Sequence, residues 1–283
     1  MKFKLSPKIA LLLSAMLFAS ALTLSLCLAF CSGQSDENVD HDTDTKPPKK
    51  DDITTSADYS YQTDISAVAD ALNTTDEAYL ILANKTYLIG ESYEPESIIQ
   101  LPSDITNGGK EVSLVGNAAV AAEALIMEMR ACGINNVSIT SGYRSYERQQ
   151  TLYQQYFAEE KAAHPSWSDE EIKAQVLTYS AYPGTSEHQT GLCMDLITTE
   201  MEGLWNFGSE TPNNPYDKGF AETDAYTWLK ENAHKFGFIL RYPKNKVDVT
   251  GYSYESWHYR FVGIDAATEI HSRGITLEEY LGK

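Results

Sequence analysis

Two histidines and two carboxylates stand in short segments whose residue types suit chemistry with metal-activated water. The first segment runs Ser186-Glu-His188-Gln-Thr-Gly-Leu-Cys-Met-Asp195, and a neutral imidazole and a carboxylate are ordinary zinc donors. The second runs Glu255-Ser-Trp-His258-Tyr-Arg, where a carboxylate three residues before a histidine suits a general base beside a metal ligand. Taken alone, the first pattern is more typical of an exposed loop histidine and an unrelated aspartate.

A third segment adds an arginine. It runs Ser141-Gly-Tyr143-Arg144-Ser-Tyr-Glu-Arg-Gln149, and a guanidinium can clamp a carboxylate or a developing oxyanion. Alone, this pattern is typical of a surface arginine at the start of a helix. Together, the segments hold two histidines and an aspartate, the count that an open zinc site requires, and Glu255 remains as a base.

The elements that must position these residues mix helices and strands without a regular βαβ rhythm, which predicts an α+β fold. We expect strands at 137–140, 192–197, 238–242 and 256–262, and a hairpin over 78–82 and 86–89. We expect helices at 118–132, capped by Asn117, and at 144–163, 168–179, 223–236, 265–272 and 277–281, with Ser168 opening a capping box and Thr223 a cap. In a regular strand Glu255 and His258 would point to opposite faces, so a bulge or bend must bring them together.

The N-terminal residues indicate the compartment. Residues 9–31 form an uninterrupted apolar run long enough to cross a bilayer as a helix, and lysines precede it, which places the remainder outside the cytoplasm. We predict that residues 1–31 are a signal peptide or a membrane anchor. Residues 32–58 are polar and acidic and predict a disordered tether, which leaves 59–283 as the folded domain.

The composition excludes some classes of protein. The chain has 283 residues, 42% of them hydrophobic, and a net charge of −18, which argues against binding to nucleic acid or a polybasic attachment to anionic lipid. Residues 59–283 hold 32 acidic and 16 basic residues, so the acidity belongs to the folded domain. Its two cysteines, Cys132 and Cys193, are predicted to be buried free thiols.

Four stretches, SGYRSYERQ, PGTSEHQTGLCMDL, FGFILRYP and YESWHYRFVG, carry a family likeness. In them the chain resembles the VanY-type D-alanyl-D-alanine carboxypeptidases, zinc peptidases of bacterial cell-wall metabolism with a fold shared by the lysostaphin and hedgehog group. The likeness runs from about residue 78 to residue 281. The pattern Ser-x-His-x-x-Gly-x-Ala-x-Asp is met except at Cys193, where the family commonly has Ala, and Glu-x-Trp-His-x-Arg is met in full.

The resemblance implies a fold and roles for single residues. The fold would be a small central antiparallel sheet flanked by helices. Glu255 would be the general base that later protonates the leaving amine, and Arg144 would polarise the scissile carbonyl or hold the oxyanion. The implied ligands of Zn²⁺ are His188, Asp195 and His258. The implied substrate contacts are Gln149, Ser186, Tyr143 and Trp257, with a plain core role as the alternative for Trp257.

The leading function implied by the resemblance is removal of the terminal D-Ala from a peptidoglycan stem peptide. An L,D-carboxypeptidase acting on the tetrapeptide stem is the alternative, because no motif here specifies the residue on the amino side of the scissile bond. A catalytically inactive wall-binding or signalling domain is a third possibility, against which the complete set of catalytic residues argues. We expect a monomer in the bacterial cell envelope, outside the cytoplasm, with no nucleic-acid partner and with membrane contact through its N-terminal segment.

Overall fold

The computed structural model describes residues 59–199 and 219–283. The predicted signal or anchor segment, 1–31, and the predicted tether, 32–58, lie outside these residues. Within the two described ranges, no helix combines the length and the apolar character needed to cross a membrane.

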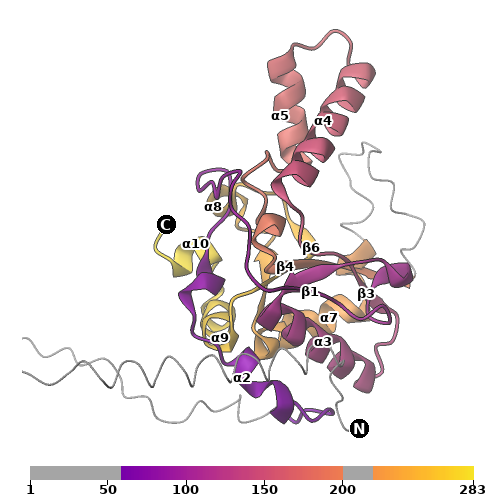
Figure 1. The fold of residues 1–283 in the computed structure, drawn as a ribbon, viewed down its shortest axis with the longest axis vertical. Helices are drawn as coiled ribbons and strands as arrows, with labels where there is room; N and C mark the ends of the chain where they lie inside the picture. The colour runs from indigo at the N-terminus through magenta and orange to yellow at the C-terminus, as the bar shows by residue number, and fades with distance from the viewer. Residues whose placement is uncertain (1–58, 200–218) are drawn as a thin grey trace, which may run out of the picture. The chain divides into compact units, whose positions relative to one another are not determined.

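A four-stranded antiparallel sheet lies at the centre of the described chain (Figure 1). Its strand order is β3 (Val137–Ser141), β4 (Cys193–Thr198), β6 (Glu255–Phe261) and β5 (Phe238–Tyr242). All six residues of β4 are buried, as expected of an inner strand covered on both faces. The predicted α+β class, the small antiparallel sheet and its four strands are therefore confirmed.

Helices surround this sheet. The α-helices are α2 (Ala69–Leu72), α3 (Gly116–Ala131), α4 (Tyr146–Ala163), α5 (Asp169–Tyr179), α7 (Asp224–Asn232), α8 (Val247–Thr250), α9 (Ile264–Arg273) and α10 (Leu277–Tyr280). The 3₁₀ turns are η1 (Ser66–Val68), η2 (Glu77–Leu80), η3 (Asn107–Gly109), η4 (Glu187–Thr190) and η6 (Ala233–Phe236). Most of α3 is buried, because its alanine-rich sequence lets neighbouring elements approach closely.

Local capping sets where several helices begin. Ser168 opens α5 with a complete capping box to Glu171, and the Thr223 hydroxyl accepts from the backbone N–H of Tyr226 at the start of α7, both as predicted. Ser145 caps α4 in the same way, so the residue before it, Arg144, stays outside the helix. Helices α4 and α5 project together from the sheet (Figure 1) around a small apolar cluster of their own.

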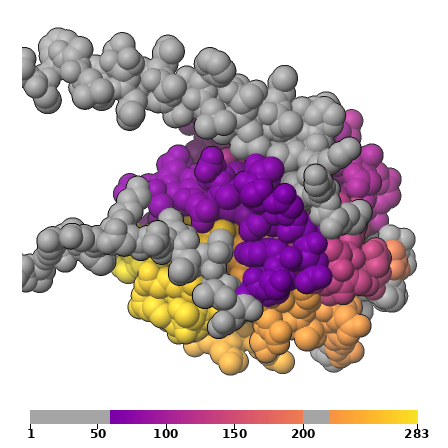
Figure 2. Space-filling model, turned by 90° about the horizontal axis from the view of Figure 1, so that it is seen from below, coloured from indigo at the N-terminus to yellow at the C-terminus, as the bar shows by residue number. Residues whose placement is uncertain are grey.

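The first described residues pack on the rest of the domain. Figure 2 shows this segment in indigo, lying across the orange and yellow parts of the chain. Buried Glu128 of α3 accepts hydrogen bonds from the backbone N–H groups of Gln62 and Thr63 at 2.7 and 2.8 Å. The ring of Tyr61 meets that of Phe236 edge to face. These contacts fix residues 61–63 against α3 and η6.

The predicted hairpin over 78–82 and 86–89 is wrong. That segment forms the turn η2 and irregular chain, and Nη2 of Arg260 donates to the carbonyls of Tyr79 and Ile81 at 2.9 and 2.7 Å. A buried guanidinium thus satisfies the backbone in place of a partner strand. A separate two-stranded sheet, β1 (Ile98–Gln100) with β2 (Ser113–Val115), was not predicted.

The two cysteines of the described residues differ in exposure. Neither forms a disulfide, as predicted. Cys193 is buried in β4, whereas Cys132 is exposed just beyond the end of α3. The prediction that Cys132 is buried is therefore wrong, because the buried face of α3 ends at Met129, three residues before it.

Candidate active site

His188 lies on the 3₁₀ turn η4, which Gly191 ends in the left-handed conformation before β4 begins. Its Nδ1 lies 2.7 Å from the carbonyl oxygen of Gly142, so Nδ1 carries the proton and donates it. The neighbouring strand β2 requires glycine at position 142, because a Cβ there would lie 2.6 Å from the carbonyl oxygen of Ser113. Nε2 of His188 is left to face Oδ2 of Asp195, 3.2 Å away.

His258 and Asp195 are directly paired across the antiparallel strands β6 and β4. Nδ1 of His258 lies 3.0 Å from Oδ1 of Asp195 and 3.5 Å from Oε2 of Glu255. Pairing between β5 and β6 shifts register between Leu240 and Tyr242, opposite Glu255. This irregularity supplies the bend that brings Glu255 to the same side as His258.

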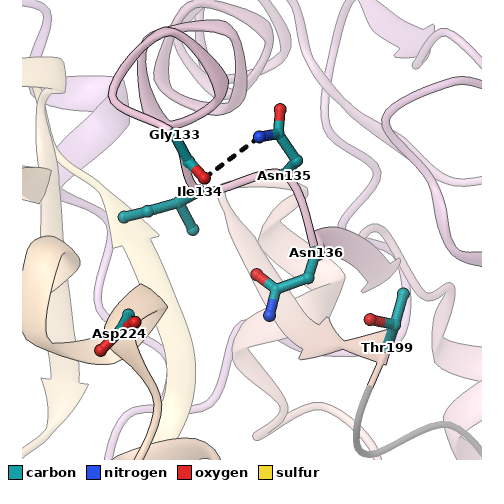
Figure 3. A pocket seen from close by; sticks show the side chains of 6 residues that line it. All are labelled: Gly133, Ile134, Asn135, Asn136, Thr199 and Asp224. Atoms are coloured by element: carbon teal, nitrogen blue, oxygen red, sulfur yellow. Dashed lines mark hydrogen bonds between the residues drawn. The ribbon is translucent and has the colours of Figure 1, made fainter.

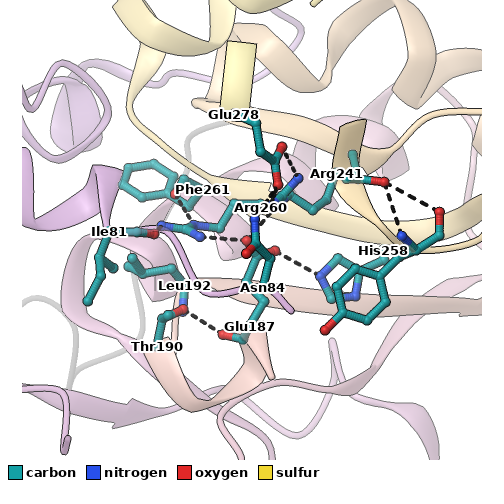
Figure 4. Close-up of polar contacts among 12 residues, drawn as sticks. Ile81, Asn84, Glu187, Thr190, Leu192, Arg241, His258, Arg260, Phe261 and Glu278 are labelled. Atoms are coloured by element: carbon teal, nitrogen blue, oxygen red, sulfur yellow. Dashed lines mark hydrogen bonds and ion pairs between the residues drawn. The ribbon is translucent and has the colours of Figure 1, made fainter. Parts of the chain in front are cut away.

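Behind His258 lies a buried carboxylate that sequence reasoning missed. Oε2 of Glu187 lies 3.1 Å from Nε2 of His258, as Figure 4 shows. Its other oxygen, Oε1, accepts hydrogen bonds from Arg241 and Arg260, each at 2.7 Å. Burial alone would raise the pKa of Glu187, but the two arginines hold that pKa well below its usual range. Glu187 is therefore an anion that holds the proton of His258 on Nε2.

The same network extends to the last helix. Arg241 binds Glu278 of α10 through both terminal nitrogens, at 2.9 and 2.6 Å, and Asn84 donates to the same carboxylate (Figure 4). All of these side chains are buried. The one sequence signal for the network was the position of Glu187 next to His188; its partners come from distant parts of the chain.

Arg144 lies beside the histidine cluster. Its backbone N–H donates to the carbonyl oxygen of His188 at 3.1 Å, and its guanidinium donates to Oε1 of Gln149 at 2.8 Å and to Oγ of Ser141. Gln149 is fully buried and its amide donates to the carbonyl of Ala181. Arg144 is thus half-buried, and Gln149 and Ser141 fix the orientation of its guanidinium.

The other predicted site residues lie around this cluster. Ser186 is buried and precedes η4 directly. Tyr143 is partly exposed, and its backbone N–H donates to Ser113 on β2. Trp257 is half-buried and, one residue before His258 in β6, projects from the opposite face of that strand.

The pKa values of the two carboxylates in the cluster, Glu255 and Asp195, are shifted in opposite directions. Burial raises the pKa of Glu255 to about 7, against the opposing effect of His258. Burial acts on Asp195 in the same sense, but the two histidines hold its pKa well below the usual range. Asp195 is therefore a permanent anion, and Glu255 can take up and return a proton near neutral pH.

A surface pocket lies elsewhere and includes none of these residues (Figure 3). Asp224 supplies its one ionisable side chain, so the lining holds no set of metal donors. The residues that line it are Gly133, Ile134, Asn135, Asn136, Thr199 and Asp224.

The chain is thus an α+β protein with a buried cluster of His188, Asp195 and His258, residue types that commonly bind a metal. Residues 111–264 match the family model described as VanY, D-alanyl-D-alanine carboxypeptidase. A putative carboxypeptidase of Bacillus subtilis, YodJ, is 33% identical over 286 residues, covering 94% of this chain and 96% of that protein. The chain belongs to the VanY D-alanyl-D-alanine carboxypeptidase family.

Other relatives share the domain. A D-alanyl-D-alanine carboxypeptidase of Enterococcus faecalis is 43% identical over 152 residues, or 54% of this chain, and the match spans 49% of that relative's length. A vancomycin-resistance D,D-pentapeptidase VanY, solved with Zn(II), has a TM-score of 0.55 at 36% identity, covering 72% of this chain and 99% of that one. The LD-carboxypeptidase LdcB has a TM-score of 0.58 at 34% identity, covering 72% and 86%.

Proposed function

We propose that the chain is a zinc-dependent carboxypeptidase that removes the terminal D-alanine from peptidoglycan stem peptides. The observation that carries this proposal is the convergence of His188 Nε2, His258 Nδ1 and the Asp195 carboxylate in a buried cluster, with Glu255 beside it. The VanY structure with Zn(II) supports the choice of metal. Family membership and the named relatives support the substrate.

The donor set fits a zinc ion. Oδ1 of Asp195 is buried and, among the described residues, has no hydrogen-bond partner, although Nδ1 of His258 is 3.0 Å away. Glu187 holds a proton on Nε2 of His258, so Nδ1 is the ring nitrogen that faces the Asp195 carboxylate and is available to a metal ion in place of a proton. A cation that both atoms bind resolves this arrangement, and a histidine backed by a carboxylate is common at metal sites.

The chain's own residues account for the proton transfers of amide hydrolysis. Bound zinc would supply a Lewis acid that lowers the pKa of water to about 7. Glu255, whose pKa lies near 7, takes the proton of the attacking water and returns it to the leaving amine nitrogen. Arg144 stabilises the negative charge that develops on the carbonyl oxygen. Gln149, Ser186, Tyr143 and Trp257 are proposed to contact the substrate.

Replacing Arg144 by Ala is expected to lower kcat about 10²- to 10³-fold, the usual effect of losing one oxyanion donor. Zinc should remain bound, because the hydrogen bond from Arg144 to the carbonyl oxygen of His188 comes from the backbone N–H, which the variant keeps. The measurement is steady-state release of D-alanine together with metal analysis. Arg148, exposed one turn further along α4, is the matched control, and an equal loss in Arg148→Ala would contradict the role of Arg144.

Replacing Glu187 by Gln is expected to weaken zinc binding about 10- to 100-fold, the usual cost of removing such a partner of a ligand histidine. An amide of the same shape has one oxygen, so it cannot accept hydrogen bonds from both arginines and from His258 at once. The proton of His258 is then no longer held on Nε2. Competition with a chromophoric chelator measures the affinity without any activity assay. Unchanged affinity in this variant would refute the positioning role, and Glu279→Gln, on the neighbouring capping box, is the control.

Incubation of the purified chain with stem peptides tests the proposed reaction. Release of D-alanine from the pentapeptide, dependent on zinc, is the expected result. Release from the tetrapeptide alone would instead support an L,D-carboxypeptidase, the second candidate, which the likeness to LdcB favours. No release from either peptide would support a binding or signalling domain. We further propose that the chain acts as a monomer outside the cytoplasm, held at the bacterial envelope by its N-terminal segment.

A further inference from the structure

Cys193 occupies an unusual position for a free thiol. It is the first residue of β4 and is fully buried. One residue, Met194, separates it from Asp195 along the strand, so the side chains of Cys193 and Asp195 project from the same face. Register places Asp195 opposite His258, and Cys193 opposite Arg260 on the same neighbouring strand. The thiol therefore lies beside the histidine cluster on the side away from the solvent.

The sulfur is within reach of both histidines. The Sγ atom of Cys193 and one ring nitrogen of each of His188 and His258 all lie within 4.8 Å of one another. These three donors overlap the His188–Asp195–His258 set through both imidazoles. The two imidazoles are thus shared by two sets of three donors, one completed by Asp195 and the other by Cys193.

We propose that the Cys193 thiolate is a fourth protein ligand of the metal in this chain. The inference rests on the proposed zinc centre and adds a donor to it. As the sulfur binds, the thiol proton is released to solvent. A sulfur donor makes the site softer, so it favours zinc, cobalt or cadmium over magnesium or calcium. The family commonly has alanine at this position, which has no donor, so Cys193→Ala is the natural comparison.

Cobalt substitution tests the proposal through a spectrum and needs no activity measurement. The full-length chain carries four cysteines; replacing Cys27, Cys31 and Cys132 by Ser leaves Cys193 as the one thiol. Addition of Co²⁺ to this variant is expected to produce a thiolate-to-cobalt charge-transfer band in the near ultraviolet, together with visible ligand-field bands. Adding Cys193→Ala should abolish the first band and keep the second, because His188, Asp195 and His258 still bind.

The outcomes separate this inference from the proposed function. Visible bands without a charge-transfer band would overturn the role of Cys193 and leave the zinc centre in place. Absence of any cobalt spectrum would overturn both. A near-ultraviolet band that persists after Cys193→Ala, when no thiol remains, could not come from a thiolate and would reject the proposal. Circular dichroism of each variant establishes that the fold is retained in the compared samples.

Discussion

Replacing Glu255 by Ala is expected to remove nearly all release of D-alanine while zinc stays bound. Glu255 is the carboxyl that lies 3.5 Å from His258 and whose pKa burial raises to about 7. Loss of a positioned general base typically lowers the rate about 10²- to 10⁴-fold. The ligands His188, Asp195 and His258 are untouched, so metal analysis should still find one zinc per chain.

The comparison for this variant is Glu269→Ala, which removes an exposed carboxylate paired with Arg273 on α9. That change should leave turnover within the error of the assay. Glu255→Gln should be as inactive as Glu255→Ala, because an amide has the shape of the carboxyl but accepts no proton. Substantial carboxypeptidase activity in either Glu255 variant would overturn the proposed base.

Replacing Asp195 by Ala is expected to remove the metal itself. Among the described residues, Asp195 is the one carboxylate that contacts both histidines, at 3.2 and 3.0 Å. The change is made in the Cys193→Ala background, so that the proposed thiolate donor cannot take its place and only the two histidines of the proposed ligand set remain. A catalytic zinc site uses three protein ligands, so dialysed protein should contain little zinc and should release no D-alanine. Metal analysis after dialysis measures the first effect directly.

Two further variants make the result for Asp195 interpretable. Asp195→Asn keeps the volume of the side chain and removes its charge, and it should also lose most of the zinc. Asp248→Ala, on the exposed start of α8, should bind one zinc per chain. Stoichiometric zinc in a folded Asp195→Ala variant would refute the assignment of Asp195 as a ligand.

Local patterns predicted much of the fold. The capping box at Ser168 and the cap at Thr223 depend on residues three apart, and both helices begin where these residues place them. The segment around 78–89 failed for a physical reason: its carbonyls are satisfied by Arg260, which lies about 180 residues away. The strands β1 and β2 are three residues long, too short for a periodic pattern.

In the site, too, short sequence patterns could be predicted, whereas contacts between distant parts of the chain could not. The segments around His188, Asp195 and His258 could be picked out because donor residues recur in short patterns, and the structure brings them together. Glu187 could not be assigned a role from its neighbours alone. Its hydrogen-bond partners are Arg241 on β5 and Arg260 on β6. Only the folded sheet shows that these strands lie side by side.

The link from His258 through Glu187 and Arg241 to Glu278 has a genetic consequence. Glu278 lies in α10, outside the segments assigned to chemistry. A variant that lacks α10 would keep every residue assigned to chemistry, yet it would leave the guanidinium of Arg241 without its bidentate partner. Mutations that remove or unfold α10 should therefore behave as active-site lesions.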